Sequence, residues 1–332
     1  MATLSTVNPT LLDLAKASDP GGKIADVVEI LNLQNEILDD MSYMEGNLIT
    51  GNRTTIRAGL PAPTWRKLYQ GVQPNKGTTV QVTDSCGMLE AYAEIDKALA
   101  DLNGNAAEYR LLEDRAHIEG INQALTSALF YGDESVNPER FTGLAPRFNL
   151  LSAGNGENII DAGGTGNDNS SIWLVVWGPQ TVHGIVPKGS KAGLQVTDKG
   201  QVTIESIDGA GGRMEAYRTH YRLDAGLTVR DWRYVVRIAN IDKSLLIKDY
   251  TTGGDLANLL TRAIELIPNI NAGRPVFYVS RTVRSMFRQQ LVNKVLQSTL
   301  TMESIAGRKV VTFDGIPVRR VDALAADEAR IV

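Results

Sequence analysis

The chain has 332 residues, of which 43% are hydrophobic, with 34 Lys plus Arg against 38 Asp plus Glu and a formal net charge of −4. These values exclude an intrinsically disordered chain and a strongly basic nucleic-acid-binding protein. The single cysteine, Cys86, excludes a disulfide scaffold. The sequence contains no run of about 18 apolar residues, so it predicts no membrane-spanning helix.

Residues 1–45 are predicted to form an N-terminal arm with a helix. Pro9 and the stretch 19–22 interrupt regular structure, whereas apolar residues recur at helical spacing over 24–45. The segment holds eight acidic residues and two lysines, which gives a net charge of −6.

Residues 46–83 are predicted to form an extended loop. Glycines and prolines recur without a helical period, and the β-prone stretches 53–58 and 78–83 can pair as a long β-hairpin. Five Lys and Arg residues and no acid give this segment a net charge of +5. A hairpin of this kind has little core of its own, so it needs a neighbour to pack against.

Residues 84–250 are predicted to form one domain with two helices and a strand-rich segment. Composition favours a short helix over 88–101, and the spacing of apolar residues predicts a long spine helix over 105–131, about 40 Å in length. The strand-rich segment covers 172–241. The predicted apolar stripe of the spine helix consists of Leu111, Ile118, Ile121, Leu125, Ala128 and Leu129.

Residues 251–332 are predicted to form a compact α/β unit that includes the C-terminus. Its predicted elements alternate in type: helix 255–267, strand 275–279, helix 281–298, and strands near 309–313 and 316–322. The stretch 281–320 holds eight cations and two acids, for a net charge of +6. The fold class predicted for the whole chain is α+β.

The sequence contains no motif that predicts an enzyme, a cofactor or a metal. It has no phosphate-binding loop, no dinucleotide-binding fingerprint, no nucleophile elbow and no zinc-protease motif. Glycine clusters at 163–166 and 209–212 are interpreted as turns. Cys86 is interpreted as a structural thiol and His183 and His220 as packing residues, although an unrecognised site near either histidine stays an alternative.

The charge distribution predicts contacts between identical chains, because complementary patches set partner choice and register. The alternative is that each charged stretch meets opposite charges of its own chain, or only solvent. The expected contact residues of the extended loop are Arg53, Arg57, Trp65, Arg66, Lys67 and Tyr69. Those of the acidic arm are Asp26, Glu29, Glu36, Asp39 and Asp40. Those of a basic partner face are Arg281, Arg284, Arg288, Arg308, Lys309, Arg319 and Arg320.

Several stretches resemble the capsid proteins of short-tailed bacteriophages. These are Gly184–Ser190 (GIVPKGS), Gly226–Ile241 (GLTVRDWRYVVRIANI), Phe313–Val318 (FDGIPV) and Asp322–Leu324. Together with the order of arm, loop, long helix, strands and α/β unit, they make the chain similar to tailed-bacteriophage major capsid proteins over nearly its whole length.

The resemblance implies the capsid fold that tailed phages share with herpesviruses, with 46–83 as a loop over a neighbouring subunit, 105–131 in a peripheral domain and 251–332 as the axial domain. In the usual order a strand-rich peripheral segment follows the axial unit. Strands 172–241 precede it here, which implies a rearranged order of segments.

The function implied is a non-catalytic head protein that assembles into pentamers and hexamers of an icosahedral shell around double-stranded DNA. Expected partners are identical subunits, scaffold, portal and decoration proteins, and packaged DNA through non-specific contacts. The expected location is the virion, after assembly in the host bacterial cytoplasm. An encapsulin-like compartment shell and another virion component, such as a portal or tail protein, are the alternatives.

Overall fold

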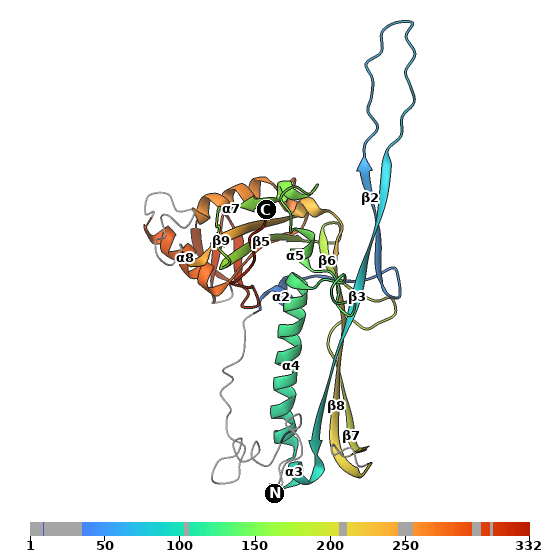
Figure 1. Ribbon diagram of the computed structural model, residues 1–332, viewed down its shortest axis with the longest axis vertical. Coiled ribbons are helices and arrows are strands. Elements are labelled where there is room, and N and C mark those ends of the chain that lie inside the picture. Colours follow the sequence, from blue (N-terminus) through green and yellow to red (C-terminus); the bar gives the residue numbers. More distant parts are fainter. Residues whose placement is uncertain are drawn as a thin grey trace.

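The computed structural model describes residue 9 and residues 35–102, 106–205, 211–244, 255–293, 300–305 and 308–332. Figure 1 shows a globular body that carries the C-terminus, an elongated body beside it, and a hairpin that projects beyond both. None of the helices in these ranges is long and apolar enough to cross a membrane.

The described elements comprise helices, short 3-10 turns and strands. The helices are α2 Ile37–Asp40, α3 Lys97–Asp101, α4 Ala106–Tyr131, α5 Leu144–Arg147, α7 Leu256–Glu265 and α8 Arg281–Asn293, with 3-10 turns at η1 Gly156–Asn158, η2 Trp232–Tyr234 and η3 Ile270–Ala272. The first strands are β1 Tyr43–Glu45, β2 Gly51–Gly59, β3 Thr78–Asp96, β4 Ile159–Asp161, β5 Asn169–Trp177, β6 Val182–Val186 and β7 Gln195–Glu205. The remaining strands are β8 Arg213–Val229, β9 Val235–Asp242, β10 Arg274–Val279, β11 Leu300–Ile305, β12 Arg308–Phe313 and β13 Ile316–Arg320.

One continuous path of strand pairing links all three parts of the molecule. Its order is β11-β12-β13-β10-β5-β6-β8-β3-β2, with β1, β4, β7 and β9 paired off this path. β10 pairs antiparallel with β5 and parallel with β13, whereas β3 pairs antiparallel with both β8 and β2. The molecule is therefore a mixed α+β fold, as the sequence predicts.

The globular body (β4, β5, β6, β9, β10, β13, α5, α7 and α8) buries both faces of its sheet. Successive β5 side chains point to opposite faces, because side chains alternate along a strand. Trp173 and Val175 join a core that includes the C-terminal half of α4, whereas Leu174 and Val176 pack in a second core that includes α7 and α8. A strand buried on both faces explains the continuous apolar run of 172–177.

The elongated body combines α4 with β8, β7 and the C-terminal part of β3 (Figure 1). The predicted spine helix is confirmed within one residue at its start. Its predicted apolar stripe is wrong in the first half, because Leu111 and Ile118 are exposed. There α4 meets the strands through a small separate cluster around the buried Tyr109 and Ile95 and through polar contacts, such as the Tyr221 hydroxyl on Asp114. Only the later turns, with Ile121, reach the main core.

The predicted helix over 88–101 is wrong over most of its length. Residues 86–96 are the second part of β3 and pair residue by residue with 216–226 of β8. Ala, Leu and Glu favour a helix locally, but tertiary pairing overrides that preference in a strand that buries Ala93 and Ile95. Only α3 is helical, and its N-cap Asp96 accepts a hydrogen bond from the Ala98 amide at 2.8 Å.

The predicted arm helix over 24–45 is described only from residue 35 onward. There it is reduced to α2, and β1 follows, pairing parallel with β6. Gly184 of β6 makes this possible, because a Cβ at that position would lie 2.8 Å from the Tyr43 ring.

The predicted boundary between 250 and 251 passes through the globular sheet. β5 pairs with β10 across it, and the second core contains residues from both sides. The strands of 172–241 are divided between two bodies: β5, β6 and β9 lie in the globular body, whereas β7 and most of β8 lie in the elongated one. The chain enters the globular body, leaves it and returns, so the strand-rich segment is not a separate unit.

Candidate assembly surface

The projecting hairpin (residues 51–85, from the start of β2 to the last β3 residue that pairs with it) has a well-defined base. β2 pairs with β3 from Gly51↔Ser85 to Gly59↔Thr78, with a register irregularity near its outer end. At the base, the Asn47 side chain makes two 2.7 Å hydrogen bonds with the backbone of Arg53. The Gly46 amide also donates to the Val186 carbonyl of β6 at 2.8 Å, which ties the hairpin to the globular body.

The apex of the hairpin (residues 60–77) displays large apolar side chains to solvent. Trp65 and Tyr69 are fully exposed, at 101% and 104%, and Leu60 and Leu68 are about as open, at 78% and 84%. Tyr69 also adopts a positive φ of 66°, a backbone conformation that non-glycine residues rarely adopt. Exposed apolar clusters of this kind mark interaction sites.

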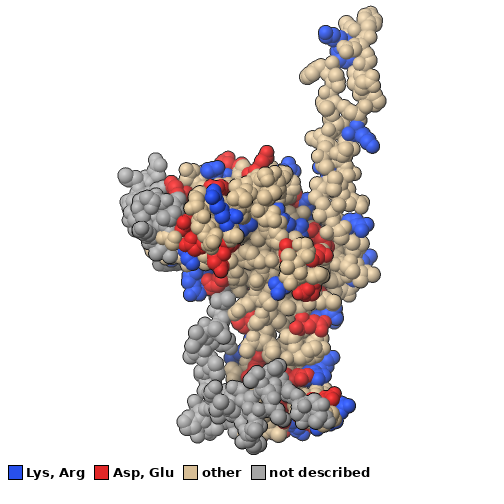
Figure 2. Space-filling model, in the orientation of Figure 1, with Lys and Arg blue, Asp and Glu red and all other residues tan. Residues whose placement is uncertain are grey.

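The hairpin carries cations without acids. Arg53, Arg57, Arg66, Lys67 and Lys76 are exposed, and among the described residues none of them makes an ion pair. Figure 2 shows Lys and Arg atoms spaced along the projecting hairpin, with no acidic atoms on its outer part. The structure thus places the six predicted loop residues together on one protruding, unneutralised element.

A wide cleft of about 1,040 Å³ lies between β2 and the turn that joins β8 to β9. Arg53 and Arg57 line it on one side, and Arg230 and Arg233 on the other. Arg233 is paired with Asp231 at 2.7 Å. The base of the hairpin therefore borders a basic groove.

The described part of the acidic arm meets the predicted basic face within the same chain. The Asp40 carboxylate is fully buried and lies 3.2 Å from Arg319 and 2.7 Å from Arg274. Glu36 lies 3.5 Å from Arg319. This geometry matches the alternative in which opposite charges pair in their own chain.

The other predicted residues of these two surfaces are more dispersed. Asp39 is exposed, and Asp26 and Glu29 lie outside the described residues. Arg281 and Arg320 share Asp322, whereas Arg288 is exposed on α8. Burial lowers the pKa of Arg284, Glu36 opposes that shift, and the neighbouring arginines 288, 320 and 319 add to it. Arg308 and Lys309 lie on β12, where only the backbone pairing is described.

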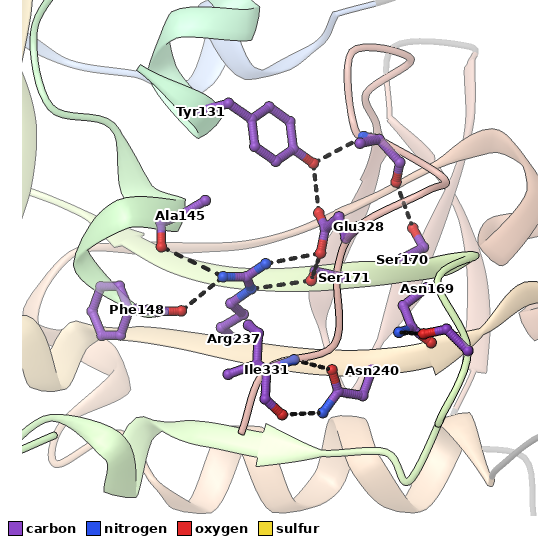
Figure 3. A network of polar contacts seen from close by, with 12 residues as sticks. Tyr131, Ala145, Phe148, Asn169, Ser170, Ser171, Arg237, Asn240, Glu328 and Ile331 are labelled. Carbon is purple, nitrogen blue, oxygen red and sulfur yellow. Dashed lines mark hydrogen bonds and ion pairs between the residues drawn. The ribbon is translucent and has the colours of Figure 1, made fainter. Parts of the chain in front are cut away.

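A buried ion pair, missed by the sequence analysis, connects the end of α4 to the globular sheet (Figure 3). Arg237 of β9 contacts Glu328 at 2.8 Å, and both side chains are almost completely buried. Arg237 also donates to the Ser171 hydroxyl at 3.1 Å and to the Phe148 carbonyl at 2.7 Å. The Tyr131 hydroxyl donates to Glu328 at 2.6 Å, and burial together with this carboxylate raises the pKa of Tyr131 well above its ordinary value.

Backbone contacts extend this network along the C-terminal strap (residues 321–332). The Ser170 hydroxyl donates to the Ala325 carbonyl at 3.1 Å. Asn240, at a positive φ of 57°, exchanges hydrogen bonds of 2.9 and 2.8 Å with the backbone of Ile331. The strap therefore fastens the end of the chain across β5 and β9 (Figure 3).

The two histidines considered for an enzyme site lie in different surroundings, one buried and one stacked on a tyrosine. His183 is buried in β6, and burial lowers its pKa to about 4, with Arg230 acting in the same direction. His220 stacks on Tyr92 at 4.4 Å and lies 3.2 Å from Glu90. Within the described ranges, no group of three or more His, Cys, Asp and Glu side chains could hold a metal ion.

Comparison with known proteins gives a matching family model and matching solved structures. A family model described as major capsid protein GP7 matches residues 19–332. A chain from the near-atomic-resolution structure of bacteriophage Epsilon15, derived from cryo-EM and modelling, is 38% identical, with a TM-score of 0.79 and 100% coverage of both chains. A search of curated proteins finds no match.

Other solved structures are more distant. The bacteriophage JBD30 capsid is 12% identical, with a TM-score of 0.46 and coverage of 96% of this chain and 99% of that one. The SrpI encapsulin of Synechococcus elongatus is 10% identical, with a TM-score of 0.45 and coverage of 70% and 95%.

Proposed function

The chain belongs to the major capsid protein GP7 family, and we propose that its copies form the pentamers and hexamers of an icosahedral head around double-stranded DNA. It is a structural protein, the major capsid subunit of a tailed phage. The proposal assigns it no catalytic step.

The observation that carries the proposal is the exposed apex of the hairpin. Four large apolar residues, Leu60, Trp65, Leu68 and Tyr69, lie in solvent on an element with no core of its own. Burying each of them against a neighbour would contribute roughly 1.5–3 kcal/mol before the entropic cost of association. In an isolated subunit these side chains stay exposed to water, whereas in a shell each contact between subunits would bury them.

Symmetry supports a closed shell of such contacts. A hairpin that meets a different surface on the next copy makes a heterologous contact, and repeated contacts of this type form a ring when the rotation between copies closes. Each contact can be individually weak, because many act together in a shell. The residues Arg53, Arg57, Trp65, Arg66, Lys67 and Tyr69 are proposed to lie in these contacts.

The same proposal covers the remaining partners. Packaged DNA would be held by sequence-independent contacts between cations and phosphates. Scaffold, portal and decoration proteins are proposed as further partners, with assembly in the host bacterial cytoplasm. The encapsulin-like alternative predicts protein cargo in place of DNA.

Electron microscopy of particles made by the chain, alone and with the other head components, tests this function. Closed shells are expected, and nuclease-resistant DNA in the particles would distinguish a phage head from a compartment for protein cargo. A species that stays monomeric under all these conditions would contradict the proposal.

Charge reversal tests the role of the hairpin cations. Changing Arg53, Arg57, Arg66 and Lys67 to Glu should reduce shell formation while circular dichroism stays unchanged, because the four side chains are exposed. A matched control reverses four exposed cations elsewhere, Arg115, Lys188, Lys191 and Lys199. Normal shells from the hairpin variant would remove the electrostatic part of the proposal.

A further inference from the structure

The elongated body contains an apolar pocket of about 300 Å³ where the C-terminal half of α4 meets β3 and β8. The buried residues Leu125, Phe141, Leu223 and Ala225 are among those that line it. Met88, which is 68% exposed, also borders it. On α4, Ala124, Ser127 and Ala128 present only small side chains to this space, so the pocket stays open.

We propose that this pocket receives the aromatic apex of the hairpin of a second copy, with Trp65 as the inserted residue. The inference rests on the proposed function and specifies which surface of the next subunit the hairpin occupies. The apex offers exposed aromatic side chains, and the pocket offers a concave apolar surface of matching chemistry. Tryptophan is among the residue types enriched at the well-packed pockets that carry most of an interface's binding energy.

A chain cannot fill its own pocket. Gly87 and Met88 line the pocket on β3, and the same strand runs from there to Thr78, where the apex begins. Ten residues of extended strand span about 33 Å. In Figure 1 the hairpin points away from α4. The contact must therefore join different copies, and it is heterologous, because hairpin and pocket are different surfaces.

Charges around the two surfaces are complementary. Arg66 and Lys67 follow Trp65 directly and are exposed. The loop 133–140, which borders the pocket, holds three acids, Asp133, Glu134 and Glu139, and one cation, Arg140. Glu139 and Arg140 line the pocket itself, and the loop as a whole carries a net charge of −2 beside it. A cationic apex and an acidic loop beside the pocket favour this pairing and its register over other apolar contacts.

A charge placed in the pocket tests the proposal. Ala124 is exposed on α4 and lines the pocket, so Ala124→Glu should leave the subunit folded. We expect the concentration required for shell assembly to rise about tenfold or more, because docking would bury the new carboxylate. The matched control is Ala116→Glu, an exposed alanine about 12 Å away along the same helix, which should change that concentration by less than about twofold.

Site-specific crosslinking provides an independent measurement. In a Cys86→Ser background, Lys67→Cys at the apex and Arg140→Cys at the pocket should be joined by a short bismaleimide reagent in assembled shells. Denaturing gels should then show ladders of covalently linked chains. Lys67→Cys with Arg115→Cys, on the exposed surface of α4 far from the pocket, should give none.

The outcomes separate this inference from the proposed function. Shells that assemble at the normal concentration with Ala124→Glu, or that give no ladder with the apex and pocket cysteines, would overturn the pocket assignment and leave the shell function intact. A crosslink from Arg140→Cys to another head protein would also overturn it. Absence of shells from the unmodified chain would instead contradict the proposed function.

Discussion

Replacing Glu328 by alanine should strongly destabilise the subunit. The change removes the carboxylate partner of Arg237, whose side chain is 5% exposed, and leaves a buried guanidinium with only neutral acceptors. Breaking a buried ion pair on one side costs about 3–5 kcal/mol. The Tyr131 hydroxyl also loses its acceptor, which adds roughly 1 kcal/mol or more.

Conservative variants separate charge from hydrogen bonding. Glu328→Gln keeps a neutral oxygen for Arg237 and Tyr131, so we expect it to lose about half as much free energy of unfolding as Glu328→Ala. The double change Arg237→Met with Glu328→Leu removes both charges and should be less destabilising than Glu328→Ala alone, because no unpaired charge stays buried.

Equilibrium unfolding of the unassembled subunit in urea is the assay, followed by tryptophan fluorescence. Trp173 is a suitable reporter, because its ring lies 4.9 Å from the Arg237 guanidinium. Glu90→Ala is the control, since Glu90 lies 3.6 Å from Arg222 and 3.2 Å from His220 at a partly exposed site, where loss of a surface pair costs about 1 kcal/mol or less. If Glu328→Ala lost no more than this control, the reasoning would be refuted.

Three further outcomes are expected. The pKa of His183 is about 4 in the folded chain and about 6.5 when unfolded, so the unfolded state binds more protons between these values and stability should fall by up to about 3 kcal/mol as pH drops from 7 to 4. His183→Gln should reduce the difference between the free energies of unfolding measured by urea titration at pH 7 and pH 4. An unchanged difference would contradict this prediction. Gly226→Ala should destabilise the fold by roughly 1–3 kcal/mol in thermal unfolding, because its Cβ would lie 2.6 Å from the Ser85 carbonyl; a variant that matches the parent would refute this clash. Burial raises the pKa of Cys86 to about 11, so its labelling by a maleimide at pH 8 should be far slower than that of a free thiol, and rapid labelling of the native subunit would argue against it.

Local patterns in the sequence predict the elements that depend on local physics. α4 follows from helical spacing, and the pairing of 53–58 with 78–83 follows from β-prone stretches separated by a turn-rich segment. The stretch 88–96 was mispredicted, because its residues favour a helix while its partner strand lies more than 100 residues later in the chain.

In the candidate surface too, features that depend on local sequence could be predicted, whereas features that depend on the tertiary fold could not. The exposed cations and aromatic residues of the hairpin could be named from composition alone, since an acid-free segment with glycines and prolines has few ways to bury them. The pocket on α4 and the Arg237–Glu328 pair could not. Both join segments that are distant in the chain and whose proximity depends on the sheet order. The predicted partner of the acidic arm was likewise not decidable, since Arg319 meets Asp40 only after β13 has joined β10.

The length of β3 has a mechanical consequence. The strand continues without interruption from the hairpin to α3, and its residues 86–96 are bonded side by side to β8. A force that pulls on the hairpin along this strand loads those hydrogen bonds in shear, all at the same time, and not one after another as in peeling. Tension at an intersubunit contact would thus be carried into the elongated body by a bonding geometry that resists rupture.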